Sequence, residues 1–167
     1  MELLIIRHAI AEPHAMEIDD VDRALTSRGR ERFAQGVAGL TRLGLRIGDV
    51  YHSPWLRAVQ TAEMLSPLVD GQLISTPHLA DDPGAGLLAH ARESGGLGRV
   101  AMVGHEPWLG QLCAWLVTGS TRAGEALLFK KGGVAWLEGG SLQPGTMVLR
   151  ALFPPRALRL LAESPTG

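Results

Sequence analysis

Short runs of consecutive apolar residues alternate along the chain with longer segments in which apolar residues recur every three or four positions. Leu3–Ile6 and Val100–Val103 are apolar at every position, a pattern typical of strands that are buried on both faces of a parallel sheet. Phe33, Val37 and Leu40 follow the helical spacing instead. The alternation of the two patterns predicts an α/β fold.

Capping and turn residues indicate where these elements begin. Ser53 followed by Pro54 is a favourable helix start, with the hydroxyl as the cap and the proline in the first turn. A helix is likewise expected from Thr26 or Ser27 to near Gly44. The remaining strands are predicted in DVYHSP (residues 49–54) and at 73–75, 132–137 and 147–152, and the remaining helices at 85–92, 107–116 and 155–161.

No internal repeat, linker or low-complexity segment divides the 167 residues. Helices that alternate with strands in this way cover both faces of the sheet that the strands form. We therefore expect a single domain, residues 1–167, built as a three-layer α/β/α sandwich around a mostly parallel central sheet. Trp108 and Trp115, seven positions apart, are expected in its core.

The charges nearly cancel, with a formal net charge of -1. No global positive field exists to hold nucleic acid or an anionic membrane, and no run of about 18 apolar residues predicts a membrane span. The lone Cys113 cannot form an internal disulfide, which fits a reducing compartment. We expect a cytoplasmic monomer that binds any anion through a local cluster of cations.

Unusual side chains follow three of the predicted strands. They are Arg7 and His8 after the first strand, His52 and Arg57 after the second, and His105 and Glu106 after Val100–Val103. In open α/β sheets ligands gather beyond the carboxyl ends of the strands, so these groups converge on one pocket if the three ends are neighbours. A lone histidine usually makes a structural contact, and we expect this of His52. The repeated order of strand, histidine and helix start weakens that explanation for His8 and His105.

The chemistry of this cluster favours phosphate over a metal ion. Two or three histidines could hold zinc, but Arg7 and Arg57 would repel a cation and no H-x-x-x-H spacing is present. Guanidinium groups bind phosphate oxygens in pairs. A neutral histidine could attack phosphorus and form a covalent phosphohistidine, while the second histidine, if protonated, and the arginines stabilise charge on the phosphoryl oxygens. No metal or other cofactor is then required.

Four blocks of the sequence resemble the motifs of the histidine phosphatase superfamily, in the family order. LIIRHA resembles the Arg-His-Gly signature, with Ala9 in place of the glycine, and SPWLRAVQTAE resembles the second conserved block. RALTSRG is similar to the segment between these two, and VGHEP to the late histidine motif. The resemblance implies a phosphoglycerate mutase-like fold. The short chain without long insertions is most similar to the SixA branch, whose members remove phosphate from protein phosphohistidine.

The resemblance also implies roles for four residues. His8 is the phosphorylated nucleophile, and Arg7, Arg57 and His105 complete the phosphate pocket. Ala9 replaces the glycine of the family signature, which implies a slightly different backbone conformation at this position. The Arg-His pair itself is intact.

The identity of the general acid stays open between three carboxyl groups. Glu106 resembles the position of the acidic donor in the acid phosphatase branch. Asp81 and Asp82 could fill the place where mutase-like members carry a glutamate, although a turn with the following proline and glycine is the better explanation for them. Arg23 could rim the pocket and bind substrate, or it could pair with the acidic loop at residues 17–22.

These observations predict a metal-independent phosphatase with a covalent phosphohistidine intermediate. A phosphohistidine-bearing protein, such as a phosphotransfer domain, is the favoured substrate, because a pocket without insertions leaves room for a protein side chain. Small phosphoesters such as sugar phosphates or nucleotides are the alternative. A mutase fits less well, since the chain has little material for a lid. A phosphate-binding module without catalysis would be natural only if His8 were replaced.

Overall fold

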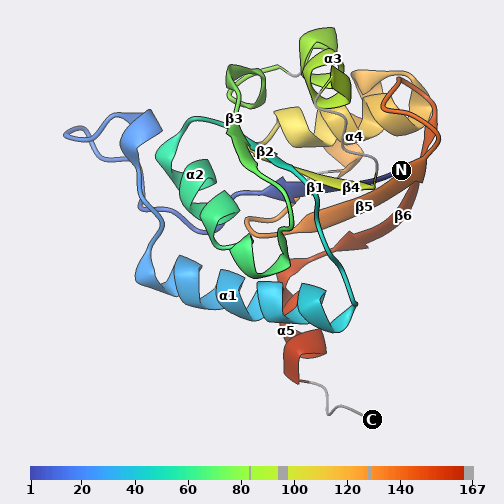
Figure 1. Ribbon diagram of the computed structural model, residues 1–167. Coiled ribbons are helices and arrows are strands. Elements are labelled where there is room, and N and C mark those ends of the chain that lie inside the picture. Colours follow the sequence, from blue (N-terminus) through green and yellow to red (C-terminus); the bar gives the residue numbers. More distant parts are fainter. Residues whose placement is uncertain (83, 94–97, 128, 164–167) are drawn as a thin grey trace.

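The computed structural model describes residues 1–82, 84–93, 98–127 and 129–163, and helices cover both faces of its six-stranded sheet (Figure 1). The strands are β1 Glu2–Arg7, β2 Val50–His52, β3 Leu73–Ser75, β4 Arg99–Gly104, β5 Val134–Gly139 and β6 Met147–Phe153. The helices are α1 Ser27–Arg42, α2 Leu56–Glu63, α3 Ala85–Glu93, α4 Trp108–Thr118 and α5 Pro155–Glu163. The predicted three-layer α/β architecture is confirmed. None of the described helices is both long and apolar enough to cross a membrane.

The order of the strands places three of their carboxyl ends side by side. In the sheet order β3-β2-β4-β1-β5-β6, the first four strands run parallel, whereas β5 is antiparallel to both of its neighbours. Arg7 of β1 pairs with Gly104 of β4, and His52 of β2 pairs with Val103. The carboxyl ends of β1, β4 and β2 therefore lie at one edge of the sheet. This is the arrangement that a common pocket for the histidines after these strands needs.

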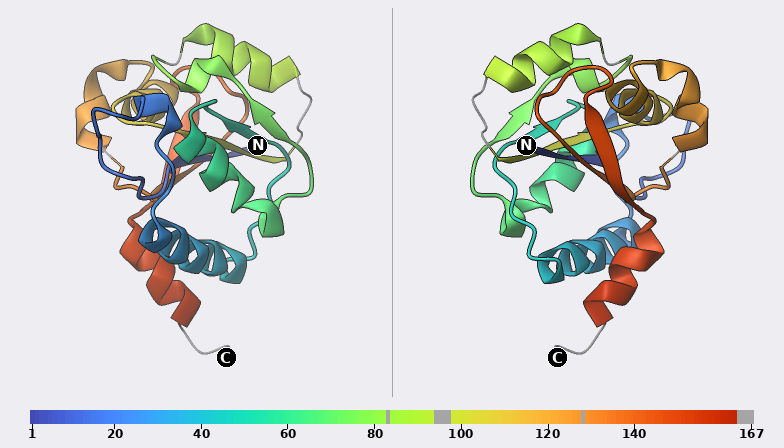
Figure 2. Two further views of the ribbon diagram at one scale, coloured as in Figure 1. Left: turned by 90° about the vertical axis from the view of Figure 1, so that its left-hand side faces the viewer. Right: turned by 90° about the vertical axis from the view of Figure 1, so that its right-hand side faces the viewer.

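Strand β1 is buried on both faces, which explains why its sequence does not alternate with polar residues. Leu4 and Ile6 pack in a cluster with α1, α2 and α5, and Leu3 and Ile5 pack with α3 and α4 on the other face. Figure 2 shows these two helical layers on opposite sides of the sheet. Because all four side chains are fully buried, β1 and the residues that follow it are firmly held.

The two predicted helix caps have different outcomes. The hydroxyl of Thr26 accepts a hydrogen bond from the amide of Gly29 at 2.9 Å, so Thr26 caps α1 as predicted. The prediction that Ser53 caps the second helix is wrong, because α2 begins at Leu56 and Trp55 is its capping residue. The hydroxyl of Ser53 accepts from the amide of Trp55 at 3.3 Å, before the helix begins, and it also lies 2.9 Å from Nε2 of His105 at the end of β4.

Four short 3-10 segments have no periodicity in the sequence and were not predicted. They are Asp20–Asp22, Ser66–Leu68, Pro77–Leu79 and Thr121–Leu127. The first of them lies above the carboxyl edge of the sheet, and its aspartate enters the site described below.

Helix α5 packs against α1 at a point where only glycine fits. A Cβ atom on Gly39 would lie 2.0 Å from the carbonyl oxygen of Leu158, whereas a Cβ atom on Gly36 would lie 3.9 Å from the Leu158 side chain, an ordinary contact. We expect Gly39→Ala to lower the free energy of unfolding by about 1–3 kcal/mol, because α5 must move away. Urea unfolding measures this loss, and Gly36→Ala is the matched control, which helix propensity should stabilise by up to about 1 kcal/mol. Equal effects of the two variants would show that the α1–α5 contact is not tight.

Candidate active site

A cavity of about 410 Å³ opens at the carboxyl edge of the sheet. It is lined by Arg7, His8, Asp20, Arg23, Trp55, Arg57, Ala80, His105, Glu106, Trp108 and Lys131. Six of these are the residues that the sequence singled out at strand ends and in the loop after the first strand, so the structure brings that set together. His52, Asp81 and Asp82 are not among the lining residues.

His8 is held in one orientation and one tautomer. Its Nδ1 lies 2.7 Å from the carbonyl oxygen of Ala9, and because a carbonyl only accepts, Nδ1 carries the proton and Nε2 carries the lone pair. The amide of Ala9 donates to the hydroxyl of Thr61 at 3.0 Å, which fixes the backbone that holds the ring. Burial, together with the charges of Arg57 and Arg7, lowers the pKa of His8 to about 3. The ring is therefore a neutral base at physiological pH.

His105 faces His8 from the end of β4. The two ring centroids are 5.1 Å apart, and Nε2 of His105 lies 2.9 Å from the hydroxyl of Ser53. Burial first, and then the charge of Arg57, lowers the pKa of His105 to about 3. The ring of Trp55 packs against it with the centroids 4.5 Å apart.

Arg7 and Arg57 both line the cavity, and hydrogen bonds anchor each guanidinium group. Nη1 of Arg7 donates to the carbonyl of Phe129 at 2.5 Å, and Nη2 of Arg57 donates to the carboxylate of Asp20 at 2.9 Å. Arg57 also lies 4.5 Å from the centre of the Trp55 ring, a cation–π contact. These contacts hold both guanidinium groups in place beside the cavity.

Three buried nitrogen atoms of the cavity have no hydrogen-bond partner among the described residues: Nε of Arg7, Nε of Arg57 and Nδ1 of His105. A buried donor without a partner costs free energy, and native structures seldom tolerate several of them together. An oxyanion in the cavity would accept from such donors. All three atoms belong to residues that line the cavity, which favours the binding of an anion there.

Asp20 connects the loop after β1 to both sides of the cavity. Burial opposes its ionisation, but hydrogen bonds from Arg57 and Arg23 outweigh burial and hold the pKa of Asp20 below its usual value. Nε of Arg23 donates to the same carboxylate at 2.7 Å. Arg23 thus lines the cavity and also pairs with the acidic loop, so both of the alternatives for this residue apply.

Both carboxylate oxygens of Glu106 accept backbone hydrogen bonds. Oε1 accepts from the amide of Phe129 at 2.6 Å, and Oε2 accepts from the amide of Gly110 at 3.1 Å. Burial raises the pKa of Glu106 in spite of these bonds and of the charge of Arg7. Since the carbonyl of Phe129 in turn accepts from Arg7, Glu106 helps to position that arginine.

The other two acid candidates lie outside the cavity. Asp81 and Asp82 are exposed in the segment after Pro77–Leu79, next to the lining residue Ala80, and neither lines the cavity. His52 is buried, and its Nδ1 lies 3.0 Å from the carbonyl of Ser53, which agrees with the structural role expected of it.

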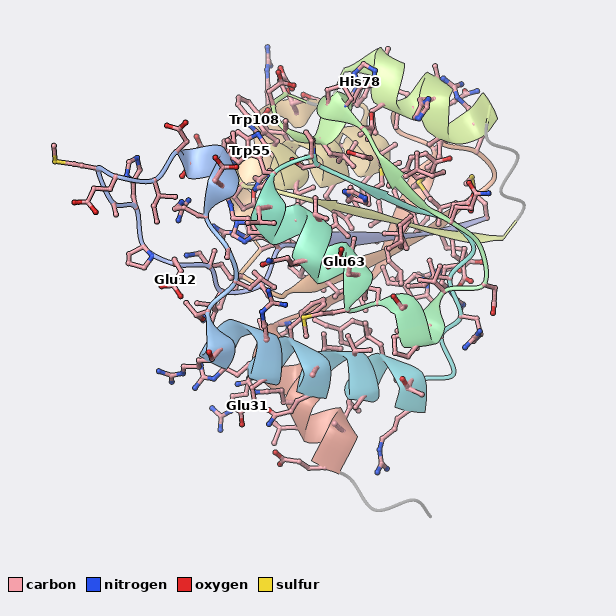
Figure 3. All side chains as sticks on the ribbon, turned by 60° about the vertical axis from the view of Figure 1, so that its left-hand side comes forward. Glu12, Glu31, Trp55, Glu63, His78 and Trp108 are labelled. Carbon is pink, nitrogen blue, oxygen red and sulfur yellow. The ribbon has the colours of Figure 1, made fainter. Side chains whose placement is uncertain are left out.

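The sequence analysis missed several lining residues. Trp108 is half-buried and lines the cavity, so its assignment to the core is wrong. Figure 3 shows Trp108 and Trp55 near each other, and both line the cavity. The position of Trp55 inside the SPWLRAVQTAE block could have indicated its role. Lys131 reaches the cavity only because β5 lies next to β1 in the sheet, and no local motif marks it.

The charge of the cavity favours an anion. Four cations line it, against the two carboxyl groups of Asp20 and Glu106; the cations are Arg7, Arg23, Arg57 and Lys131. Throughout the described ranges, no three or more His, Cys, Asp or Glu side chains lie together as they would to hold a metal ion.

Two sequence comparisons identify the family. Residues 3–85, which include the first three of the four blocks, match the histidine phosphatase superfamily (branch 1). An uncharacterized protein of Picosynechococcus sp. is 35% identical over 145 residues, which are 84% of this chain and 87% of that protein. The chain belongs to the histidine phosphatase superfamily. It is therefore a phosphatase, with the cavity described above as its candidate active site.

Solved structures of similar fold include several phosphatases. The protein histidine phosphatase SixA complexed with tungstate is 26% identical, with a TM-score of 0.79 over 95% of this chain and 99% of that one. The α-ribazole phosphatase from Shigella flexneri, at 16% identity, has a TM-score of 0.70 over 93% and 97% of the two chains and shares the fold alone. The predicted phosphoglycerate mutase-like fold and the likeness to the SixA branch are confirmed.

Proposed function

We propose that this phosphatase hydrolyses phosphohistidine in proteins, such as a phosphotransfer domain, through a covalent phosphate on His8 and without a metal ion. The observation that carries the proposal is the state of the two carboxyl groups in the cavity. Asp20 is tied to Arg57 and Arg23, and both oxygens of Glu106 accept backbone N–H groups. Neither is placed as a free proton donor, which suits a leaving group that needs little protonation.

The cationic side of the cavity supports binding of a phosphoryl group. Arg7, Arg57 and His105 each present a buried nitrogen without a partner in the described part of the chain. Planar guanidinium groups match the oxygens of a phosphoryl group and stabilise the charge on them during transfer. The similar SixA structure is a complex with tungstate, a tetrahedral oxyanion like phosphate, which supports the same use of this cavity.

The proposed reaction has two displacement steps at phosphorus. In the first, the lone pair on Nε2 of His8 forms a bond to phosphorus, and the bond from phosphorus to the substrate nitrogen breaks with its electron pair on that nitrogen. In the second, a water oxygen bonds to phosphorus, the bond to Nε2 breaks and returns its pair to His8, and both water protons leave with the phosphate. His8 is neutral before the first step and after the second.

The nature of the leaving group decides how much acid catalysis is needed. An alkoxide from a phosphoester is a strong base and needs a proton as it leaves. An imidazole whose second nitrogen is protonated leaves as a neutral ring. The rings of Trp55 and Trp108 at the cavity offer flat apolar surfaces for such an imidazole.

The test is phosphate release by the purified protein, with EDTA present, from a phosphohistidine-bearing phosphotransfer domain and from a panel of sugar phosphates, nucleotides and aryl phosphates. We expect kcat/KM to be at least about 10²-fold higher for the phosphoprotein, since the cavity supplies no free acid for the ester leaving groups. A higher kcat/KM for any small ester would contradict the assignment of substrate, and loss of activity with EDTA would contradict the metal-free reaction.

One observation favours small phosphoesters as a second candidate. Burial raises the pKa of Glu106, and a carboxyl group that is protonated in part could donate to an ester oxygen. Glu106→Gln separates the two roles. If Glu106 is a donor, the variant slows aryl phosphate cleavage more than phosphohistidine cleavage. If it only positions Arg7 through Phe129, both substrates are slowed by the same factor.

A further inference from the structure

A second cavity continues from the active site between two helices. It has a volume of about 470 Å³, and its lining comes from residues 29–36 of α1, from 130–132 and from 154–159 at the start of α5. Arg7 and Lys131 line both this cavity, here called the α1–α5 groove, and the active-site cavity. The groove therefore lies next to the active-site cavity, with these two cations between them. Figure 1 shows α5 beside α1.

The groove is strongly basic. Five cationic side chains line it in addition to Arg7, and no carboxyl group does; they are Arg32, Lys130, Lys131, Arg156 and Arg159. Within the described part of the chain, none of the five forms an ion pair. The whole chain has a net charge of -1, so this concentration of positive charge is local. Cations gathered in this way attract an anionic partner and repel one another when none is bound.

Apolar residues also line the groove; they include Ile10, Phe33, Pro154 and Pro155. Gly132 lies beside Phe33, and its φ of +79° favours glycine at this position. An inorganic ion would use the cations but not these apolar residues. A polypeptide segment with both acidic and apolar side chains would use both.

We propose that the α1–α5 groove binds an acidic segment of the phosphoprotein substrate, close in sequence or space to its phosphohistidine, and thereby selects proteins over small phosphorylated molecules. This inference rests on the proposed function, since it names the kind of protein that brings its phosphohistidine to His8. A polynucleotide has the charge but not the apolar side chains, so a peptide fits the groove better.

The test compares two synthetic peptides, each with one phosphohistidine and one leucine, in which the flanking residues are either aspartates or asparagines. For the wild type we expect KM to be about 10-fold lower for the aspartate peptide, with kcat changed less than about twofold. Arg156→Glu combined with Arg159→Glu should remove this preference. Turnover of free phosphohistidine should not change, because neither arginine lines the active-site cavity.

The matched control is Arg92→Glu combined with Arg122→Glu, which alters the net charge equally. Both arginines are exposed and lie on α3 and on Thr121–Leu127, across the sheet from α5. The control should keep the preference for the aspartate peptide. Equal KM values for the two peptides, or equal losses in the two double variants, would overturn the proposal. Thermal unfolding of both double variants shows whether either effect comes from folding.

Binding of the unphosphorylated aspartate peptide, measured by fluorescence anisotropy, separates this proposal from the proposed function. If the wild type hydrolyses no phosphohistidine, not even the free amino acid, the proposed function fails. The groove is still tested, because the dissociation constant of the unphosphorylated aspartate peptide can be compared between the wild type and the variant with Arg156→Glu and Arg159→Glu. An unphosphorylated oligonucleotide that binds more tightly than the aspartate peptide would overturn the peptide assignment.

Discussion

His8→Ala should reduce phosphate release by at least about 10⁴-fold, because no other group of the cavity can take the place of the nucleophile. Nε2 of His8 carries the free lone pair of the ring, because Nδ1 donates its proton to the carbonyl of Ala9. His105 is next to it, but its Nε2 is engaged with the hydroxyl of Ser53. The measurement is steady-state hydrolysis of the best substrate found for the wild type, with His78→Ala, an exposed histidine outside the cavity, as the control.

The same variant should still bind the oxyanion. Arg7, Arg57 and His105 are unchanged in it, so the dissociation constant for tungstate should stay within about fivefold of the wild-type value. Acid-labile, base-stable phosphate should be trapped on the wild type during turnover and should be absent from the variant. Residual activity within a factor of ten of the wild type, or label that persists in His8→Ala, would exclude a covalent intermediate on this residue.

His8→Ala also tests whether the ring is held neutral. The pKa of His8 is about 3 in the folded protein, against an ordinary value of 6.5, so between these values the unfolded chain binds a proton at this position that the folded protein does not. Stability that is present above pH 6.5 is therefore lost as the pH falls towards 3. Between pH 6 and 4 the free energy of unfolding of the wild type should fall more steeply than that of the variant, by about 1.4 kcal/mol per pH unit. Parallel curves in urea unfolding would show that His8 titrates normally.

Local sequence patterns were sufficient for the elements that depend on local physics. The run Leu3–Ile6 has no polar position, and it forms a strand buried on both faces. The hydroxyl of Thr26 accepts from the amide of Gly29 and caps α1, while it also donates to the carbonyl of Ile10. Ser53 has the same capping chemistry, and its hydroxyl accepts from the amide of Trp55 at 3.3 Å, but α2 begins only at Leu56. The same hydroxyl lies 2.9 Å from Nε2 of His105, a tertiary contact between the ends of β2 and β4 that no local pattern encodes.

The candidate site likewise contains residues that sequence patterns predict and residues that only the tertiary fold places there. Residues at strand ends could be predicted because parallel strands bring their carboxyl ends to one edge, and the family blocks named the same residues. Lys131 enters from the loop before β5, and the α1–α5 groove depends on how a C-terminal helix packs on α1. Such placements follow from the order of strands and from close helix contacts like that of Gly39 with Leu158. The hydrogen bonds from the amides of Phe129 and Gly110 to Glu106 also depend on tertiary packing, and the choice between a donor role and a positioning role for Glu106 stays a prediction that Glu106→Gln tests.

Arg57→Ala should reduce kcat/KM by about 10²- to 10³-fold, the cost of removing one preorganised donor from the charge that develops on the phosphoryl oxygens. Arg57 is 3% exposed, and Asp20 holds it through both its carboxylate and its backbone carbonyl. The ring of Trp55, with its centre 4.5 Å from the guanidinium carbon, also holds the group, and Nε of Arg57 has no partner among the described residues. Arg57→Lys should be less than about tenfold more active than Arg57→Ala. The ammonium group of lysine cannot hold the ion pair with Asp20 and bind two phosphoryl oxygens at the same time.

The ion pair between Arg57 and Asp20 predicts how much kcat/KM falls in a further variant and in its control. Asp20→Asn keeps a hydrogen-bond acceptor for Arg57 and removes the charge, so it should cost less than Arg57→Ala, about 10-fold in kcat/KM. Arg46→Ala is the control, since Arg46 is an exposed arginine paired with Asp70 away from the cavity. If Asp20→Asn raised activity instead, the pair would compete with substrate for Arg57. Asp20 would then hold Arg57 in a resting arrangement that an incoming phosphoryl group must break, and the free donors of Arg7 and His105 would make the first contact.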